Sequence, residues 1–150
     1  MRRLLVCCVL FVAAPVAIAQ EPLTKGQIID QSAAICRDLN EDVAPHARKM
    51  RRADGLNGFI RHGRRFVRTS RPYVRDLADL TPPDGGRRYR RFVSNTQEAL
   101  DLLERALNAL EARRGRLAER RANESGEAAA RAKRAAKRYG LRDSCITYVT

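Results

Sequence analysis

Hydrophobic residues recur along the chain every three to four positions, and no alternation of apolar and polar residues persists beyond a few positions. This spacing places the apolar side chains on one face of an α-helix. It continues through most of the segment after residue 20. The pattern therefore predicts an all-α fold built from amphipathic helices.

The first predicted helix begins at Thr24. Thr24 can accept a bond from the amide of Gln27, whose side chain can in turn reach back to the Thr24 amide. A seven-residue apolar repeat then continues at Ile29, Cys36, Val43 and Met50. The segment Asp54-Gly55 with Asn57-Gly58 supplies a turn.

A second helix is predicted from about residue 56 or 59 to residue 80. Gly63 and Ser70 lie on its apolar face, seven positions apart, where small residues allow a neighbouring helix to come close. The segment Thr81-Pro82-Pro83-Asp84-Gly85-Gly86 is the strongest helix breaker in the sequence and separates the two halves of the chain.

The third predicted helix extends from about Arg87 to near Arg121. Asn123-Glu124-Ser125-Gly126 is expected to break or bend the chain before a short Ala-rich helix. Whether these are two helices or one bent helix stays open. Gly140 is well placed as a left-handed residue that ends the last helix, with Leu141 folding back on its final turn.

The N-terminus has the three parts of a secretory signal peptide. Arg2 and Arg3 precede an uncharged apolar run, and Ala17-Ile18-Ala19 is a small-x-small cleavage site before Gln20. The apolar run is shorter than the ~20 residues that span a bilayer. We therefore expect residues 1–19 to be a signal peptide, residues 20–150 to form one domain without a transmembrane span, and the product to be secreted or extracytoplasmic, in the cell envelope.

Removal of residues 1–19 would leave two cysteines, Cys36 and Cys145. Two cysteines in an exported chain allow a single disulfide pairing. Four helices joined by short connections favour an up-down-up-down bundle. That topology brings the tail with Cys145 near the first helix, so the sequence predicts a four-helix up-down-up-down bundle with one disulfide.

The chain is strongly basic, with a net charge of +13, and 26 of its 30 basic residues are arginine. Five arginines on the second helix are spaced three, four, three and four apart and form one stripe beside the apolar face. They are Arg61, Arg64, Arg68, Arg71 and Arg75. A second cluster of Arg87, Arg88, Arg90 and Arg91 surrounds Tyr89.

Such a positive field attracts polyanions. The stripe is thus a candidate anion-binding site for an anionic envelope polymer, membrane headgroups or an acidic protein. The alternative is a solvated outer face without a specific partner. Nucleic acid is disfavoured, since an exported protein rarely meets it and no recognition motif or exposed aromatic platform is evident.

No catalytic, metal or cofactor constellation is evident. Ser94, Ser125 and Ser144 have no partner histidine, and His46 and His62 are expected on the surface beside arginine. Three acidic residues on the third helix are expected to pair with Arg105 and its neighbours; these are Glu98, Asp101 and Glu104. The sequence therefore favours a non-enzymatic binding protein without a metal or cofactor.

Two alternatives remain at lower weight. Leu23-Thr24-Lys25-Gly26-Gln27 resembles the L-T-x-x-Q motif of small, basic, helical envelope chaperones, which would imply an ATP-independent chaperone-like role, although the second copy expected in that family is absent. Exported chorismate mutases are also helical, disulfide-closed and rich in arginine. Their spaced Arg-Lys-Glu/Gln set does not align with the predicted helices.

Several short segments resemble a group of small exported helical proteins of high-GC Gram-positive bacteria. They are Thr24-Lys25, Gln31, Ala34-Ile35-Cys36, Leu80-Thr81-Pro82-Pro83, and Tyr139-Gly140-Leu141 ahead of Cys145. The resemblance covers most of the chain after the signal peptide. It implies export, a helical fold and a disulfide, and it implies no activity.

Overall fold

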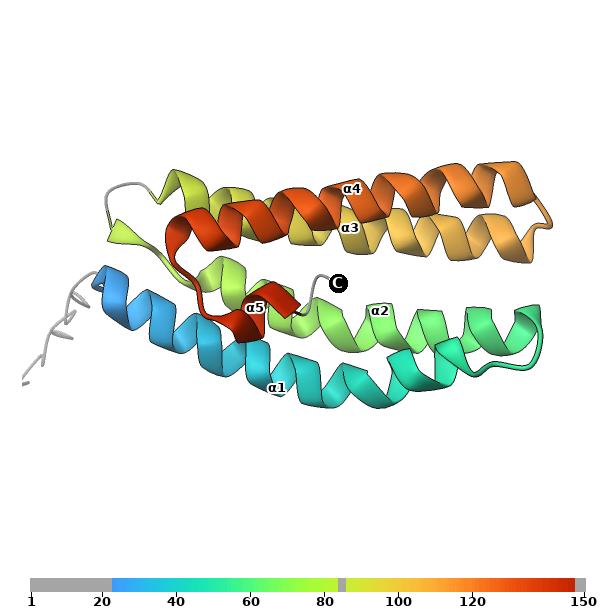
Figure 1. The fold of residues 1–150 in the computed structure, drawn as a ribbon, viewed down its shortest axis with the longest axis horizontal. Helices are drawn as coiled ribbons and strands as arrows, with labels where there is room; N and C mark the ends of the chain where they lie inside the picture. Colours follow the sequence, from blue (N-terminus) through green and yellow to red (C-terminus); the bar gives the residue numbers. More distant parts are fainter. Residues whose placement is uncertain (1–22, 84–85, 148–150) are drawn as a thin grey trace, which may run out of the picture.

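The computed structural model describes residues 23–83 and 86–147, and these residues form helices joined by short connections (Figure 1). The helices are α1 (Lys25–Arg51), α2 (Leu56–Asp79), α3 (Arg87–Glu111), α4 (Gly115–Tyr139) and α5 (Asp143–Thr147). The predicted signal peptide with its cleavage site, and Asp84-Gly85 of the predicted breaker, lie outside the described residues.

Helices α1 to α4 form an antiparallel bundle in which each helix packs against the next one along the chain. The short helix α5 contacts both α1 and α4 and lies between them (Figure 1). The four-helix bundle predicted from the apolar periodicity is thereby confirmed. The sequence predicted only a tail where α5 lies.

Helix α1 begins with the predicted capping box. The backbone amide of Gln27 donates to Thr24 Oγ1 (3.3 Å), and the Thr24 amide donates to Gln27 Oε1 (2.8 Å). These bonds satisfy amides that have no partner inside the helix. Leu23 packs partly buried against the core. Helix capping therefore accounts for the residues that resemble the chaperone motif.

The predicted boundary between the last two long helices is wrong. Helix α3 ends at Glu111 rather than near Arg121, and the chain reverses at residues 112–114, where Arg113 has a left-handed φ of 56°. Helix α4 then starts at Gly115 and continues through residues 123–126. The predicted short fourth helix is thus a full-length one.

Packing against α3 explains why α4 stays helical through its polar segment. Ser125 Oγ donates to the backbone carbonyl of Ala99 on α3 (2.8 Å), so this hydroxyl is satisfied inside the helix pair. Glu124 pairs with Arg121 one turn earlier (2.6 Å). A stripe of buried alanines lies along the rest of α4: Ala118, Ala128, Ala132, Ala135 and Ala136. Small side chains of this kind let the two helices approach closely.

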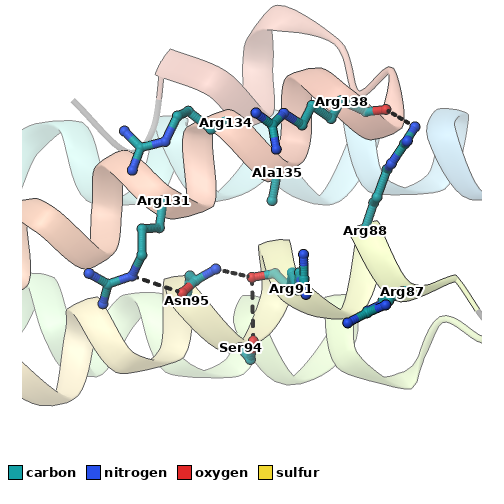
Figure 2. A pocket seen from close by; sticks show the side chains of 9 residues that line it. All are labelled: Arg87, Arg88, Arg91, Ser94, Asn95, Arg131, Arg134, Ala135 and Arg138. Carbon is teal, nitrogen blue, oxygen red and sulfur yellow. Dashed lines mark hydrogen bonds between the residues drawn. The ribbon is translucent and has the colours of Figure 1, made fainter.

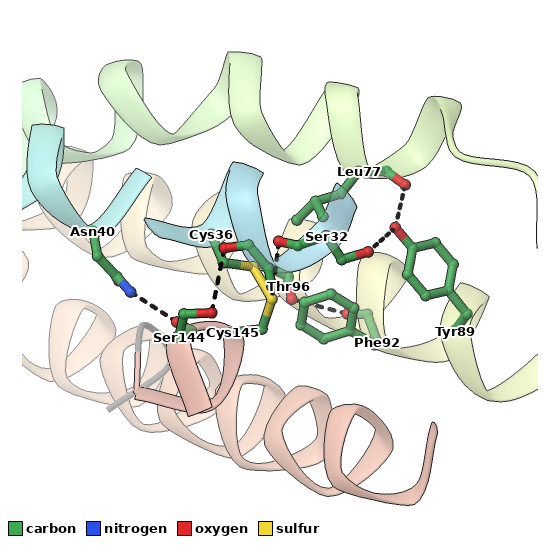
Figure 3. The surroundings of a disulfide bond; sticks show 10 residues. Ser32, Cys36, Asn40, Leu77, Tyr89, Phe92, Thr96, Ser144 and Cys145 are labelled. Carbon is green, nitrogen blue, oxygen red and sulfur yellow. Dashed lines mark hydrogen bonds between the residues drawn. A yellow bond between two sulfur atoms is a disulfide. The ribbon is translucent and has the colours of Figure 1, made fainter. Parts of the chain in front are cut away.

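The predicted disulfide is confirmed. Cys36 on α1 and Cys145 on α5 are bonded, with Cα atoms 5.1 Å apart, and both side chains are buried (Figure 3). Asn40 Nδ2 also donates to the backbone carbonyl of Ser144 (2.7 Å). These contacts fasten α5, and with it the end of α4, to α1.

A buried hydrogen-bond chain lies next to the disulfide (Figure 3). Ser32 Oγ on α1 donates to Tyr89 Oη (3.2 Å), and Tyr89 Oη donates to the carbonyl of Leu77 on α2 (2.8 Å). Burial raises the pKa of Tyr89 to about 12. These hydrogen bonds connect α1, α2 and α3 at the end of the bundle where α3 begins.

The predicted left-handed glycine is also confirmed. Gly140 follows α4 with a φ of 93°, and the amide of Leu141 donates to the carbonyl of Ala136 (3.0 Å). The side chain of Leu141 is buried in the core. This turn fixes where α4 ends and directs the chain toward α5.

Candidate anion-binding site

Arginines from two antiparallel helices line a groove between the first half of α3 and the second half of α4 (Figure 2). The groove has a volume of about 920 Å³. Its lining residues are Arg87, Arg88, Arg91, Ser94 and Asn95 on α3, and Arg131, Arg134, Ala135 and Arg138 on α4. None of them is acidic. We call this hollow the α3–α4 groove.

Helical spacing explains why these arginines meet. On α4, Arg131, Arg134 and Arg138 are three and four residues apart, so they share one face. On α3, Arg87 and Arg91 are one turn apart and belong to the opening turns. The start of a helix carries a partial positive charge and normally favours acidic residues. The first turn of α3 holds no acidic residue, so its arginines add to this positive charge.

The polar side chains that line the groove beside the arginines bond within the protein. Asn95 Nδ2 donates to the carbonyl of Arg91 (2.6 Å), and Ser94 Oγ donates to the same oxygen (3.3 Å). Asn95 Oδ1 accepts a bond from Arg131 Nε (3.3 Å). The guanidinium groups are therefore the main donors that remain for a ligand.

Most of the guanidinium groups have no acidic partner. Arg131 pairs with Glu98 (3.0 Å), and Arg88 donates to the backbone carbonyl of Arg138 (3.3 Å) at the end of α4. Within residues 23–83 and 86–147, no ion pair involves the side chains of Arg87, Arg91, Arg134 or Arg138. An anion in the groove would relieve the repulsion among these charges.

The five predicted arginines lie along one side of α2, and we call them the α2 stripe. Four of them, all except Arg75, line a smaller hollow of about 600 Å³, but this hollow also contains Glu104 and Glu111 from α3. Arg64 donates to both carboxylate oxygens of Glu111 (3.2 and 2.6 Å) and to Asn108 Oδ1 (3.0 Å). The guanidinium of Arg64 is therefore already bound by side chains of α3.

Arg71 is occupied in the same way. It pairs with Asp101 (2.9 Å) and with Glu104 (2.5 Å). The hydrogen bond to Glu104, followed by that to Asp101, raises the pKa of the Arg71 guanidinium. Arg61, Arg68 and Arg75 have no ion pair in the described part of the chain. The structure thus brings the stripe together and pairs two of its five charges.

The same contacts correct the predicted pairing on the third helix. Glu98, Asp101 and Glu104 were expected to pair with Arg105 and its neighbours, but they pair with Arg131 on α4 and with Arg71 on α2. Helix packing explains the difference, because these carboxylates lie beside the neighbouring helices. Sequence spacing along one helix cannot show this.

Sequence reasoning identified the arginines of α3 but missed those of α4 as their partners. No ligand contact was predicted for Arg134 or Arg138. The misplaced α3–α4 turn explains the omission, since a short fourth helix would not align residues 131–138 with residues 87–95. The spacing of three and four from Arg131 to Arg138 was the available signal.

The two histidines lie near each other between α1 and α2. Both are partly buried rather than fully on the surface, and neither Nδ1 atom has a hydrogen-bond partner among the described residues. Burial lowers the pKa of His62, and Arg61, Arg65 and Lys49 lower it further. The described residues contain no cluster of three or more His, Cys, Asp or Glu side chains that would hold a metal ion.

Comparison with known proteins gives no relative from which a function can be transferred. No protein-family model, curated protein or solved structure matches the chain. In the part of the chain that the structure describes, no helix is long and apolar enough to cross a membrane. Function is therefore inferred from the geometry and charge of the two arginine surfaces.

Proposed function

We propose that this chain is an exported, non-enzymatic binding protein that holds an anionic ligand in the α3–α4 groove. The observation that carries this proposal is a groove lined by six arginines and no carboxylate. Five of these arginines, all except Arg131, have no ion pair within the described residues. Arginine donates two parallel hydrogen bonds to phosphate or carboxylate, so each guanidinium without an ion pair can bind one anionic group of a ligand. In the envelope, such a ligand would be an anionic polymer, a headgroup or an acidic protein.

The disulfide supports an extracytoplasmic location, because disulfides form and persist in oxidising compartments. Residues 1–19 carry the predicted export signal. A chaperone-like role is less favoured, since clients are normally held on exposed apolar surface. Among the described residues, Leu56 is the large hydrophobic side chain that stands exposed, and it begins α2 at the opposite end of the bundle from the groove.

An enzyme of the helical mutase type also remains less favoured. That chemistry relies on a mixed set of arginine, lysine and glutamate or glutamine around one small dicarboxylate. The α3–α4 groove is lined by arginine, serine, asparagine and alanine. Assays for chorismate turnover and for suppression of client aggregation separate these two alternatives from a binding protein.

The test compares two triple variants of equal net charge. One replaces Arg91, Arg134 and Arg138 in the groove by Gln; the other replaces Arg61, Arg68 and Arg75 of the α2 stripe by Gln. None of these six side chains has an ion pair in the described part of the chain, so both variants should fold. Circular dichroism checks this.

We expect the groove variant to bind anionic polymers about ten- to a hundredfold more weakly than the parent. This estimate takes about 0.5–1 kcal/mol for each of the lost contacts. The stripe variant should lose much less. Affinities for polyphosphate, polyglutamate and dextran sulfate, measured by calorimetry, decide the matter. Equal losses in the two variants would show that net charge alone attracts the polymer, and absence of binding to all three would contradict the proposal.

A further inference from the structure

The α3–α4 groove continues into a second hollow at the end of the bundle. This hollow, of about 300 Å³, is lined by Lys25, Pro83, Gly86, Arg87, Arg88, Arg138 and Tyr139. Arg87, Arg88 and Arg138 line both hollows. Positive groups therefore follow one another without interruption from Arg131 on α4 to Lys25 at the start of α1. We call this course the basic path.

The basic path is longer than one small anion. Along α4 alone, Arg131 and Arg138 are separated by about 10 Å, at 1.5 Å of helix rise per residue. The path then extends to Lys25, whose Nζ lies 5.3 Å from the centre of the Tyr139 ring. A single phosphate or dicarboxylate would leave most of these charges uncompensated. An extended ligand with repeated negative charges would compensate them together.

Positive side chains flank the path from both helices (Figure 2). Arg87 and Arg91 project from α3 and Arg134 and Arg138 from α4. A phosphate within a chain exposes two unbridged oxygens on opposite sides of the backbone, so both helices can contact each unit. A polycarboxylate carries its anionic groups on side branches, each of which faces one side. The forked donor of arginine fits phosphate and carboxylate alike, so the preference comes from this two-sided presentation of the phosphate oxygens.

We propose that the ligand is a linear chain of repeating phosphate groups without bases, lying along the basic path from Arg131 to Lys25. This inference rests on the proposed function and names the ligand class of the same site. Tyr139 is 7 % exposed and is the aromatic residue that lines the path, so no exposed ring is present there on which bases stack. No large apolar side chain of the described residues stands exposed beside the groove to insert into a bilayer.

The experiment uses the disulfide-intact parent protein. Affinities are measured by calorimetry for triphosphate, long-chain polyphosphate and poly(glycerol phosphate), and for polyglutamate with the same number of charges. Poly(dT) and vesicles of phosphatidylglycerol, compared per accessible phosphate, are the other two probes. We expect both phosphate polymers to bind about tenfold more tightly than polyglutamate, poly(dT) or vesicles, since the contacts are geometric as well as electrostatic.

A lysine pair tests the length of the path. Lys25→Gln should weaken binding of long-chain polyphosphate and flatten its logarithmic salt dependence by about 0.7, the value for one phosphate contact on a single strand. Its effect on triphosphate, which can span only part of the path, should be smaller than its effect on the long chain. Lys49→Gln is the matched control, because Lys49 is also exposed on α1 but lines a separate hollow near the other end of the helix.

The outcomes separate this inference from the proposed function. Equal affinity for polyglutamate and polyphosphate would overturn the phosphate preference and leave the groove as a general anion site. Tighter binding to poly(dT) or to vesicles would replace the ligand class with nucleic acid or membrane. Equal effects of Lys25→Gln and Lys49→Gln would contradict the inference that the ligand extends along the basic path to Lys25. Loss of all binding to anionic polymers would overturn the proposed function itself.

Discussion

The α2 stripe and the α3–α4 groove are both built from arginines at helical spacing, yet the hollow beside the stripe also contains carboxylates, whereas the groove is lined by no acidic residue. Across from the stripe, α3 presents carboxylates that engage Arg64 and Arg71. Across the groove, arginines face arginines, and within the described residues Arg131 is the groove arginine that has an ion pair, with Glu98. A row of positive residues is thus a structural contact or an open site depending on the helix that packs beside it.

Loss of the disulfide should have the largest effect, and it should affect the groove more than the α2 stripe. It fastens α5 to α1, and α5 follows directly from the end of α4, which holds the arginines 131, 134 and 138 of the groove. Replacement of Cys36 and Cys145 by Ser should lower the free energy of unfolding by about 4–5 kcal/mol in the chain-entropy model, for a loop closed over 109 residues. Urea unfolding measures this loss.

Hydrogen exchange of the reduced protein locates the damage. At a temperature where the far-UV signal shows intact helices, amides of residues 131–139 should exchange faster, while amides of α2 beside Arg64 and Arg71 should change little. Polyphosphate affinity should fall in parallel. Equal loss of protection in α2 and in the end of α4 would contradict the view that the bond supports the groove.

Two helical glycines, one packed and one exposed, test how closely α2 packs against α3. A Cβ added at Gly63 on α2 would lie 2.8 Å from Leu107 Cδ2, whereas a Cβ at Gly126 on α4 would meet nothing within 4 Å. Both are helical positions, where alanine gains up to about 1 kcal/mol over glycine. Overpacking a filled core costs about 1–3 kcal/mol.

Gly126→Ala should therefore stabilise the protein, and Gly63→Ala should be less stable than Gly126→Ala by about 1–3 kcal/mol, because the helix-propensity gain is common to both. Denaturant midpoints at constant slope give this difference. Equal midpoints would mean that Leu107 moves aside without cost, and the close approach of α2 and α3 at Gly63 would then carry no energetic weight.

Much of the fold could be predicted from the sequence because its signals are local. Apolar periodicity, the capping box at Thr24 and the left-handed Gly140 act within a few residues. The turn at 112–114 could not be predicted in this way. Alanine and arginine are good helix formers, and the left-handed position is held by Arg113 rather than by a glycine. Packing of α4 against α3 decides the reversal.

The candidate site was likewise predictable where its signal is local and not where it depends on packing between helices. The arginines of the stripe were visible as a pattern, but their pairing with Asp101, Glu104 and Glu111 depends on how α2 and α3 are aligned. The groove could be predicted only with the α3–α4 turn in its correct place, because this turn brings the arginines of residues 87–91 beside those of residues 131–138. A charge pattern on one helix is readable in sequence, whereas its neutralisation is a property of two helices.

The smallest expected effect is a difference in stability between single arginine variants. Arg71→Gln leaves Asp101 and Glu104 without their partner, and half-exposed ion pairs of this kind contribute about 0.2–1 kcal/mol. Arg134 has no ion pair within the described residues and lies among other arginines. Arg134→Gln should therefore leave the free energy of unfolding unchanged or raise it by a few tenths of a kcal/mol.

Salt provides the control for this last comparison. Exposed charges are screened over about 8–10 Å at physiological ionic strength and over about 3 Å at 1 M. The gap in unfolding free energy between Arg71→Gln and Arg134→Gln should therefore shrink in 1 M sodium chloride, because both the lost attraction and the relieved repulsion are screened. A gap that persists unchanged in high salt would mean that Arg71 acts through the packing of its stem. In that case the contrast between the paired Arg71 and the unpaired Arg134 would not be electrostatic.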